Sequence, residues 1–573
     1  MERRLLLVFA LTFVVIILSQ PLLKKYFPQP ATPPTQTQGQ AQPAPAISAP
    51  TGNAVASPKA TVSVPSASAS TQATSESETV IENDLYRITF TNRGAQVKSW
   101  VLKKYNDNHG QLLDLVNSTA APKYGYPLSL WMYDEALRNK VNSALYVASD
   151  FGTLHVPGSV TFEYADADIA VRKTFRFDNS YVVRIETSVS SKGSSVTALP
   201  MWPAGFGDET SAASYSSSQI EHQYNGNTER LAAKKAIGGN TLQGPFNWAG
   251  VTDQYFAAAF VPDDPRNLAV VTLHNLVDIP KNLEKPNPNE TVKASVLGVA
   301  VGNPGGPTVE RIYVGPKALS VLESVPVPTI SEQPQDLRAL VDFGYLGVVA
   351  RPLFIWLKWT YEHWVPNWGW AIVIQTLIIN LALLPLRISS MKAALKMQKV
   401  QPQMKAIQEK YKKYGMRDPR RQEMNAEIGA LMKREGANPV GGCLPMLIQM
   451  PFLFAYYRML GAAIDLRQAH WLWIRDLSSQ DPYYILPIAV VITMLLTQRM
   501  TPQTGMDPAQ QRMMNVMMPV MMGVICFNLA AGLCLYWSEG NLVGIVQQVI
   551  MNRTPLGREM RELALKRARK KEK

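Results

Sequence analysis

Five long apolar stretches fall between Trp368 and Met551, and they constrain the fold of this chain more than any other feature. A helix of roughly 20 apolar residues is long enough to cross a lipid bilayer. Most of these stretches are near or slightly below that length, which indicates tilted helices or a locally thinned bilayer. We expect five membrane-spanning helices, over Trp370–Leu386, Cys443–Leu460, Tyr484–Gln498, Met513–Leu529 and Leu533–Met551.

The first and the last of these stretches carry polar side chains around their middle. A charged side chain at the centre of a membrane helix costs roughly 2.5–3.5 kcal/mol, so such groups normally face a bundle interior or a water-filled cavity. We therefore predict that the two stretches line a common polar site. The polar residues are Gln375, Thr376 and Asn380 in the first stretch, and Ser538, Glu539 and Asn541 in the last.

The N-terminal 79 residues divide into an apolar segment and a polar one. Arg3 and Arg4 precede the apolar run Leu5–Leu18, which is typical of a signal peptide or an uncleaved membrane anchor. Ser19-Gln20-Pro21 is a poor cleavage site, which favours an anchor over residues 1–27. Residues 28–79 are rich in Pro, Ala, Ser and Thr, so we expect a disordered linker there.

The positive charges indicate how the chain is oriented in a membrane. Much of the net charge of +13 lies in residues 388–440 and in the tail 553–573, both next to apolar stretches. Because Lys and Arg accumulate on the cytoplasmic side, both segments and both termini are expected there. With the N-terminal anchor this topology has six spans and places residues 80–330 outside. The basic segments also suit anionic phospholipids, and ribosomal RNA is a secondary interpretation.

Residues 80–330 show the period-two alternation of β-strands and little helical periodicity. Ile81–Phe90 is predicted as one strand, and Val171–Phe177 with Tyr181–Val189 as a hairpin turning at Asp178-Asn179. We expect a large antiparallel β-sandwich, a fold that often binds sugars. Its histidines have neither metal-site nor triad spacing, and the three cysteines of the chain imply no disulfide. No catalytic and no metal site is therefore predicted; the histidines in question are His155, His222 and His274.

Two further elements flank the first apolar stretch. Residues 331–366 mix Trp with charged residues and contain Pro352, as expected of an amphipathic helix in the headgroup region. Residues 388–440 are predicted to form a helical hairpin, because the first half carries apolar residues at coiled-coil spacing. Gly415 and Asp418-Pro419 are expected in the turn. Methionine suits adaptable apolar contacts, although a simple internal seam also explains the pattern. The expected contact residues of the hairpin are Met397, Met404, Lys412 and Lys413.

Several motifs in this half of the chain resemble the YidC family of membrane-protein insertases, in its Gram-negative form with a large periplasmic domain. Asn438–Pro445 with Gln449-Met450-Pro451 is similar to the signature of that family's third span, and Asp481–Pro487 to the entry of the next span. Asn367-Trp368-Gly369 and Gly532–Leu542 also match in order. The resemblance extends over about Asp336 to Arg553, so residues 367–552 correspond to the membrane core of the family.

The resemblance implies an insertase and chaperone of the inner membrane, working on nascent membrane proteins alone or beside the Sec translocon. In that family a hydrated groove opens to the cytoplasm and to lipid. Such a groove shortens the apolar path for a polar segment while the hydrophobic effect draws the apolar helix into lipid. This mechanism needs no cofactor, and the chain has no Gly-rich phosphate loop. We therefore expect a protein that is not an enzyme.

The chain departs from the family pattern at two positions. The family usually has an arginine in the middle of the groove, where the alignment places Asn380, and Glu539 occupies a position that is commonly apolar. Asn380 could instead bond a neighbouring helix, and the two aromatic residues of the last stretch could be interfacial anchors. We nevertheless predict a neutral or weakly acidic groove, lined by Gln375, Thr376, Asn380, Tyr536, Trp537 and Glu539.

Two other functions remain as alternatives. A secondary transporter would have internal repeats and paired broken helices, of which the sequence shows no sign. An envelope-anchored carbohydrate-binding protein would act through residues 80–330 alone.

Overall fold

The computed structural model describes residues 70–281, 287, 289–329, 334–414, 418–437, 444–500 and 513–572. The predicted anchor 1–27 and most of the linker 28–79 lie outside these residues, as do Gly415 and most of the Asn438–Pro445 motif.

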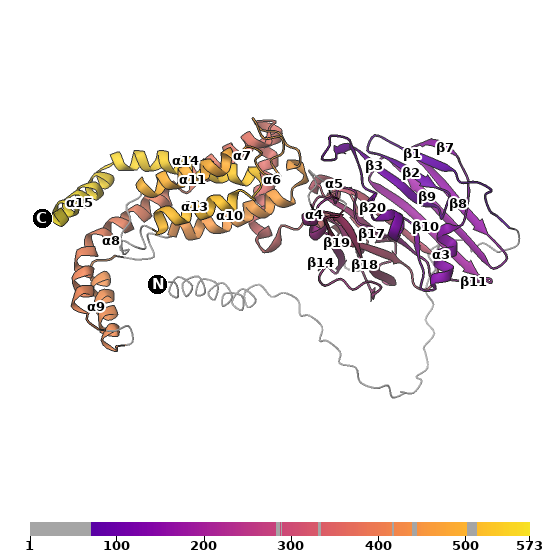
Figure 1. The fold of residues 1–573 in the computed structure, drawn as a ribbon, viewed down its shortest axis with the longest axis horizontal. Helices are drawn as coiled ribbons and strands as arrows, with labels where there is room; N and C mark the ends of the chain where they lie inside the picture. Colours follow the sequence, from indigo (N-terminus) through magenta and orange to yellow (C-terminus); the bar gives the residue numbers. More distant parts are fainter. Residues whose placement is uncertain are drawn as a thin grey trace. The chain divides into compact units, whose positions relative to one another are not determined.

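The β-rich part of the chain, coloured indigo to plum in Figure 1, contains three large sheets. The first has the order β4-β3-β2-β1-β7, from β1 (Glu78–Glu82), β2 (Tyr86–Thr91), β3 (Gln96–Asn106), β4 (Leu112–Asp114) and β7 (Gly152–His155). The second is ten-stranded with the order β14-β13-β16-β17-β20-β10-β9-β8-β6, and β11 (Ser194–Ser195) pairs with β10. Its other strands are β6 (Val147–Ala148), β8 (Gly158–Ala165), β9 (Ile169–Phe177), β10 (Val182–Ser191), β13 (Gln219–Tyr224), β14 (Asn227–Ala232), β16 (Trp248–Thr252), β17 (Phe256–Pro262) and β20 (Thr308–Pro316).

The third sheet has the order β15-β18-β19-β12-β5. It consists of β5 (Leu130–Trp131), β12 (Leu199–Trp202), β15 (Thr241–Gly244), β18 (Leu268–Pro280) and β19 (Thr291–Gly302). A further pair joins β21 (Pro326–Val327) to β22 (Gln335–Asp336). The short helices of this part are α2 (Ala121–Tyr124), α3 (Glu135–Ser143), α4 (Ala212–Ser217) and α5 (Leu319–Glu323).

Aromatic side chains join the sheets face to face. Phe90 of β2 lies 5.7 Å from Phe162 of β8 and 4.9 Å from Phe175 of β9, measured between ring centroids. Trp100 of β3 lies 6.0 Å from Trp202 of β12 in the same way. The predicted β-rich domain is therefore confirmed, and its strands pair antiparallel except for the parallel pair β1 and β7.

The predicted hairpin at Asp178-Asn179 is confirmed, because β9 and β10 pair antiparallel with Val183 opposite Phe177. The single strand predicted over Ile81–Phe90 is wrong. The side-chain oxygen of Asn83 accepts hydrogen bonds from the backbone of Leu85 and Tyr86, both at 2.8 Å, and this turn separates β1 from β2. The β-rich structure also begins before Val80, since β1 starts at Glu78 and Thr71 pairs with Ala165.

The remaining long helices form the second part of the chain, drawn in rose to yellow in Figure 1. They are α6 (Gly347–His363), α7 (Trp368–Ala382), α8 (Leu384–Lys410), α9 (Arg420–Arg434), α10 (Leu444–Ala462), α11 (Ile485–Met500), α13 (Met518–Cys526), α14 (Ala531–Arg553) and α15 (Pro555–Glu572), with a π-helical turn at Met513–Met517. Pro352 is accommodated inside α6 and does not interrupt it.

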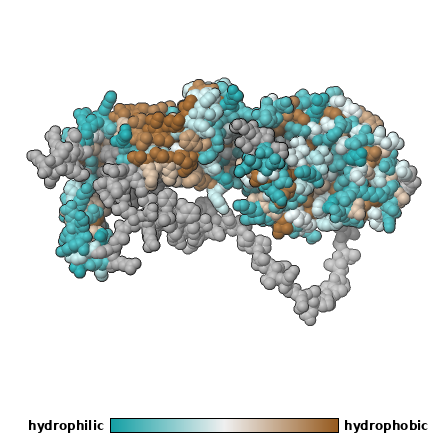
Figure 2. Space-filling view, viewed as in Figure 1, coloured by the Kyte–Doolittle hydropathy of each residue, from teal (hydrophilic) through white to brown (hydrophobic). Residues whose placement is uncertain are grey.

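The first predicted span is not one straight helix. Helices α7 and α8 meet at a 49° bend after Ala382, where Pro385 lacks the N–H that would continue the hydrogen-bond ladder. In the described part of the chain no single helix is both long enough and apolar enough to cross a membrane, whereas this bent pair together is. Two shorter apolar helices are Ile485–Met500 and Asn515–Cys526. Hydrophobic side chains gather on the visible surface of the apolar helices, whereas hydrophilic ones cover α9 (Figure 2).

The predicted hairpin is confirmed for α8 and α9. Val400 of α8 packs with Leu431 of α9 and with Ala437, and Met404 and Ile407 border this cluster. The C-terminal tail is more than a basic extension, since α15 contacts α8. Met560 packs against Met391 and Leu395, and the Lys399 Nζ lies 2.6 Å from a carboxylate oxygen of Glu559.

Lys173 of β9 is fully buried and ties the first sheet to the second. Its Nζ donates hydrogen bonds to the carbonyl oxygens of Gly94 (3.0 Å), Ala95 (2.8 Å) and Leu128 (2.6 Å). A lysine buried in this way is stabilised because each of its three donors has an acceptor.

We predict that Lys173→Met destabilises the β-rich domain strongly, because it leaves three buried carbonyl groups without a donor. At about 1–3 kcal/mol for each unpaired group, the loss is about 3 kcal/mol or more. Thermal unfolding of the full-length protein in detergent measures it. Lys98→Met is the control, because Lys98 forms an exposed ion pair with Glu78 that is worth about 1 kcal/mol or less. Equal effects of the two variants would contradict the assigned role.

Candidate functional site

The start of α7 is held by the residues of the Asn367-Trp368-Gly369 motif. The Asn367 side chain caps the helix by accepting a hydrogen bond from the backbone of Trp370 at 3.2 Å, and its amide donates to the His470 carbonyl. Gly369 is required because a Cβ there would lie 2.1 Å from the Trp471 ring. The motif thus positions α7 against the segment that connects α10 to α11.

Gln375 joins α7 to two other helices. Its amide donates to the Leu353 carbonyl of α6 at 3.0 Å, and its side-chain oxygen accepts a hydrogen bond from the Tyr456 hydroxyl of α10. Tyr456 in turn stacks on Tyr536 of α14, with the ring centroids 4.0 Å apart. The predicted site residues Gln375 and Tyr536 are therefore brought together through Tyr456, a residue that the sequence reasoning did not select.

Thr376 and Asn380 lie on the face of α7 that contacts α14. A Cβ on Gly540 would lie 3.9 Å from the Thr376 methyl group and 3.7 Å from the Asn380 amide nitrogen, so glycine allows the two helices to approach closely. The Thr376 hydroxyl donates to the Ile372 carbonyl, and the Asn380 amide donates to the Thr376 carbonyl. Both side chains thus bond within their own helix, and both are buried.

The bend between α7 and α8 creates a second polar contact with α14. Asn380 is one of the last residues of α7, and its carbonyl accepts a hydrogen bond from the Gln547 amide at 3.1 Å. The Gln547 oxygen accepts a hydrogen bond from Arg387 at 2.7 Å, and the guanidinium lies where a side chain on Gly544 would stand. Within the described residues Arg387 has no carboxylate at ion-pair distance.

Glu539 has different surroundings from the other predicted site residues. It is half-buried on α14 and makes no hydrogen bond or ion pair within the described part of the chain. At intervals of three, seven and eleven residues it is followed by Leu542, Val546 and Ile550, which share its helix face and are 50%, 52% and 60% exposed. A carboxylate therefore stands at one end of an exposed apolar stripe, which we call the α14 stripe.

The structure brings four of the six predicted groove residues into the contacts of α7, α10 and α14, namely Gln375, Thr376, Asn380 and Tyr536. Trp537 packs against the same core from a half-buried position, and Glu539 faces outward. Of the other polar residues, Asn541 donates to Thr493 of α11 at 3.2 Å, and Ser538 bonds within α14.

The predicted hairpin contacts lie apart from these residues. Met397 is buried, Met404 borders the seam, and Lys412 and Lys413 are exposed near the hairpin tip. Cys526 and Cys534 are buried and unpaired, as expected of packing residues. Sequence reasoning missed Arg387 and Gln547 as site residues; the glycines Gly540 and Gly544, four residues apart on α14, were the available signal for a close helix contact.

Two family models together match most of the chain. A family model described as the 60Kd inner membrane protein matches residues 359–558, and one described as the YidC periplasmic domain matches residues 78–356.

Curated relatives carry the name membrane protein insertase YidC. The protein of Citrifermentans bemidjiense is 31% identical over 497 residues, which cover 83% of this chain and 85% of that protein. That of Wolinella succinogenes is 39% identical over 303 residues, which cover 53% of this chain and half (50%) of that protein. A solved structure described as an active YidC insertase with its first transmembrane domain resolved is 17% identical, with a TM-score of 0.34, and covers 85% of this chain and 95% of that one.

We predict that Gln375→Leu destabilises the helical part by about 1–3 kcal/mol, because it removes the acceptor of the buried Tyr456 hydroxyl and the side-chain donor to the Leu353 carbonyl. Thermal unfolding in detergent, followed by the fluorescence of the many tryptophans, measures the change. Thr360→Val is the control, because the buried Thr360 hydroxyl donates to the Trp356 carbonyl within α6. If the two variants lose the same stability, Gln375 does not join the helices as described.

Proposed function

The chain belongs to the YidC family of membrane protein insertases, and on that basis we propose that client helices enter the membrane along the face of α14 that begins at Glu539. Insertion of membrane proteins is the activity of the family. The proposal concerns which residues of this chain contact the client helix.

The observation that carries the proposal is the pair of exposed apolar stripes on adjacent helices. Ile488, Ile492 and Leu496 of α11 are 50%, 51% and 43% exposed, and they lie four residues apart on one helix face. The α14 stripe has the same character. Contiguous exposed apolar surface of this kind marks a membrane or protein contact. A client helix that slides along it exchanges water for apolar contact, so the hydrophobic effect supplies the driving force.

Glu539 gives the α14 stripe a polar end. A half-buried carboxylate without a protein partner keeps water around it, and this water can accompany the polar segment that precedes a client helix. We propose that Gln375, Thr376, Asn380, Tyr536 and Trp537 shape this region from behind. Three of them, Gln375, Asn380 and Tyr536, already bond or stack between helices. Arg387 provides a cation in the same helix contact, although the position of the family arginine is occupied by Asn380.

The proposed topology has six spans, with both termini in the cytoplasm and the β-rich domain in the periplasm of a Gram-negative inner membrane. It rests on the basic residues of the α8–α9 hairpin and of the tail. The exposed lysines Lys412 and Lys413 suit contact with anionic phospholipid or with a ribosome. Met404 borders the seam and Met397 is buried, so both support the hairpin more than they contact clients. Cooperation with the Sec translocon is part of the proposal.

We predict that Glu539→Leu slows insertion in cells depleted of the wild-type protein, because it removes the hydrated group at the end of the α14 stripe. Glu539→Gln keeps a hydrated polar group but removes the negative charge. It therefore shows whether insertion depends on the hydration or on the charge of Glu539. We expect Asn380→Leu to slow insertion less, because the Asn380 amide bonds only within α7 while its carbonyl still meets Gln547. Pulse-labelling with protease protection of a single-span client measures the rate. Wild-type rates in Glu539→Leu, Asn380→Leu and the double variant would falsify the proposal.

The alternative of an envelope-anchored carbohydrate-binding protein predicts that all activity lies in the β-rich domain. Removal of residues 78–327, from β1 to the end of β21, tests this directly. We expect the truncated protein to keep most of its insertion activity, because the residues that carry the proposal all follow Leu353. Complete loss of insertion by a truncated protein that still reaches the membrane would favour the alternative.

A further inference from the structure

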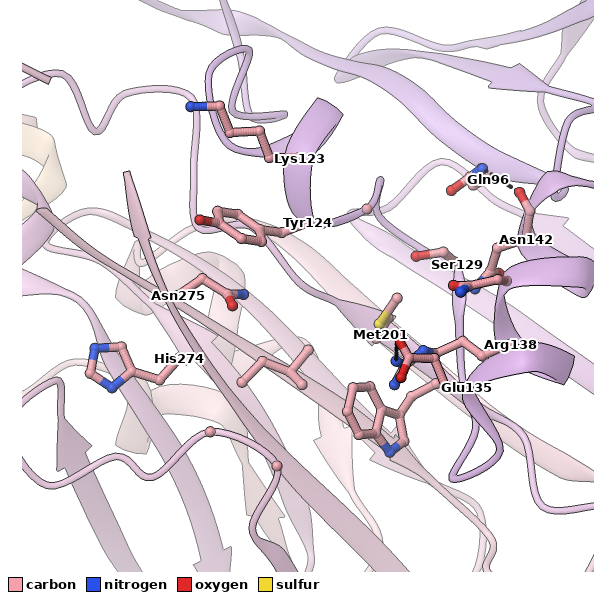
Figure 3. A pocket seen from close by; sticks show the side chains of 16 residues that line it. Gln96, Lys123, Tyr124, Ser129, Glu135, Arg138, Asn142, Met201, His274 and Asn275 are labelled. Carbon is pink, nitrogen blue, oxygen red and sulfur yellow. Dashed lines mark hydrogen bonds and ion pairs between the residues drawn. The ribbon is translucent and has the colours of Figure 1, made fainter. Parts of the chain in front are cut away.

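The β-rich domain contains a cavity of about 710 Å³ whose lining includes none of the residues of the proposed client path. It lies between α2, α3, β5 and β18, and its size is within the range of about 300–1,000 Å³ typical of small-molecule sites. Figure 3 shows Lys123, Tyr124 and Asn275 on one side of it, with Ser129, Asn142 and Arg138 on the other.

Arg138 is the most informative residue of the lining. Its guanidinium lies 4.4 Å from the centroid of the Trp131 ring, which holds it in place by a cation–π contact. Its side chain is only 21% exposed, and its one charged neighbour is the Glu135 carboxylate at 3.7 Å. Within the described part of the chain its N–H groups make no hydrogen bond. A fixed guanidinium with free donors is suited to bind a carboxylate or a phosphate in two-point fashion.

Other residues of the lining also have hydrogen-bond donors without an acceptor in the described part of the protein. The Lys123 ammonium and the Asn275 amide make no hydrogen bonds within the described residues. The Ser129 hydroxyl donates to the Tyr126 carbonyl, which leaves its oxygen free to accept. A ligand for this cavity therefore needs many acceptor oxygens, at least one donor and a negative charge.

His274 does not make the cavity a catalytic or metal site. Its two ring nitrogens lie 2.9 Å from the Ala236 carbonyl and 3.1 Å from the Ser295 hydroxyl, so both are engaged by the protein. In the described residues there is no cluster of side chains able to hold a metal ion. The cavity thus has the character of a binding site.

We propose that this cavity binds an acidic saccharide, a polyol that carries one carboxylate or phosphate. The hydroxyl groups of a sugar both donate and accept, which matches Asn275 and Ser129. The acidic group pairs with Arg138, and Lys123 on the opposite side of the cavity adds a second positive charge. A simple anion leaves most of the volume empty, and a neutral sugar leaves uncompensated the net positive charge that remains after Glu135 pairs with Arg138. Met201 and Leu273 add apolar surface for the C–H face of a sugar ring.

The test uses the full-length protein in detergent with glucuronic acid and glucose, which differ by one carboxylate. Saturation-transfer NMR and titration calorimetry are expected to give an affinity for glucuronate about tenfold or more above that for glucose, the size of one charge-assisted hydrogen bond. Arg138→Gln is expected to remove this preference. Lys123→Gln, at an exposed position that does not support the fold, is expected to reduce it.

Glu135→Gln is a matched control that should change the affinity for glucuronate in the opposite direction. It removes the carboxylate that competes for Arg138, so glucuronate should bind a few-fold tighter while glucose is unchanged. The proposal is overturned if neither sugar binds at millimolar concentration, or if the preference survives both Arg138→Gln and Lys123→Gln. Full displacement of glucuronate by an equal concentration of acetate or of a short acidic peptide would overturn it as well.

Discussion

The helical part of this protein depends on the hydrogen bonds that Gln375 makes to two neighbouring helices. In an apolar environment an unpaired amide is costly, so these bonds fix α7 relative to α6 and α10. Because Tyr456 both donates to Gln375 and stacks on Tyr536, the same contacts position α14. The outward orientation of Glu539 and of the α14 stripe follows from that position. Polar residues that are costly in lipid therefore act here mainly as joints between helices.

Much of this arrangement could be predicted from the sequence. The spacing of Val400, Met404 and Ile407 was enough to predict the hairpin seam. The first and last apolar stretches do contact each other, through Asn380, Gly540 and Gln547 and not through Ser538, Glu539 or Asn541. The contact itself could not be predicted, because it depends on which glycines of α14 face α7. For the same reason the role of Arg387 could not be predicted, because its guanidinium bonds Gln547 and lies beside Gly544 of α14.

Local chemistry explains the errors in the fold. Period-two alternation continues from Ile81 to Phe90, but the Asn83 side chain bonds the backbone of Leu85 and Tyr86 and turns the chain. The lack of an N–H in Pro385 likewise ends α7 within an apolar run that was predicted as one helix. In both places a single residue competes with the regular backbone ladder, and an average over a window of residues does not detect it.

The central claim is that client helices pass along the α14 stripe, and site-specific photo-crosslinking tests it most directly. A photoreactive amino acid at Leu542 or Val546 should label a stalled nascent chain whose apolar segment has just left the ribosome. The same probe at Val524 of α13, which is at least as exposed, at 58%, but lies outside the stripe, should give much weaker labelling. Equal labelling from the two helices, or labelling from Val524 alone, would contradict the account.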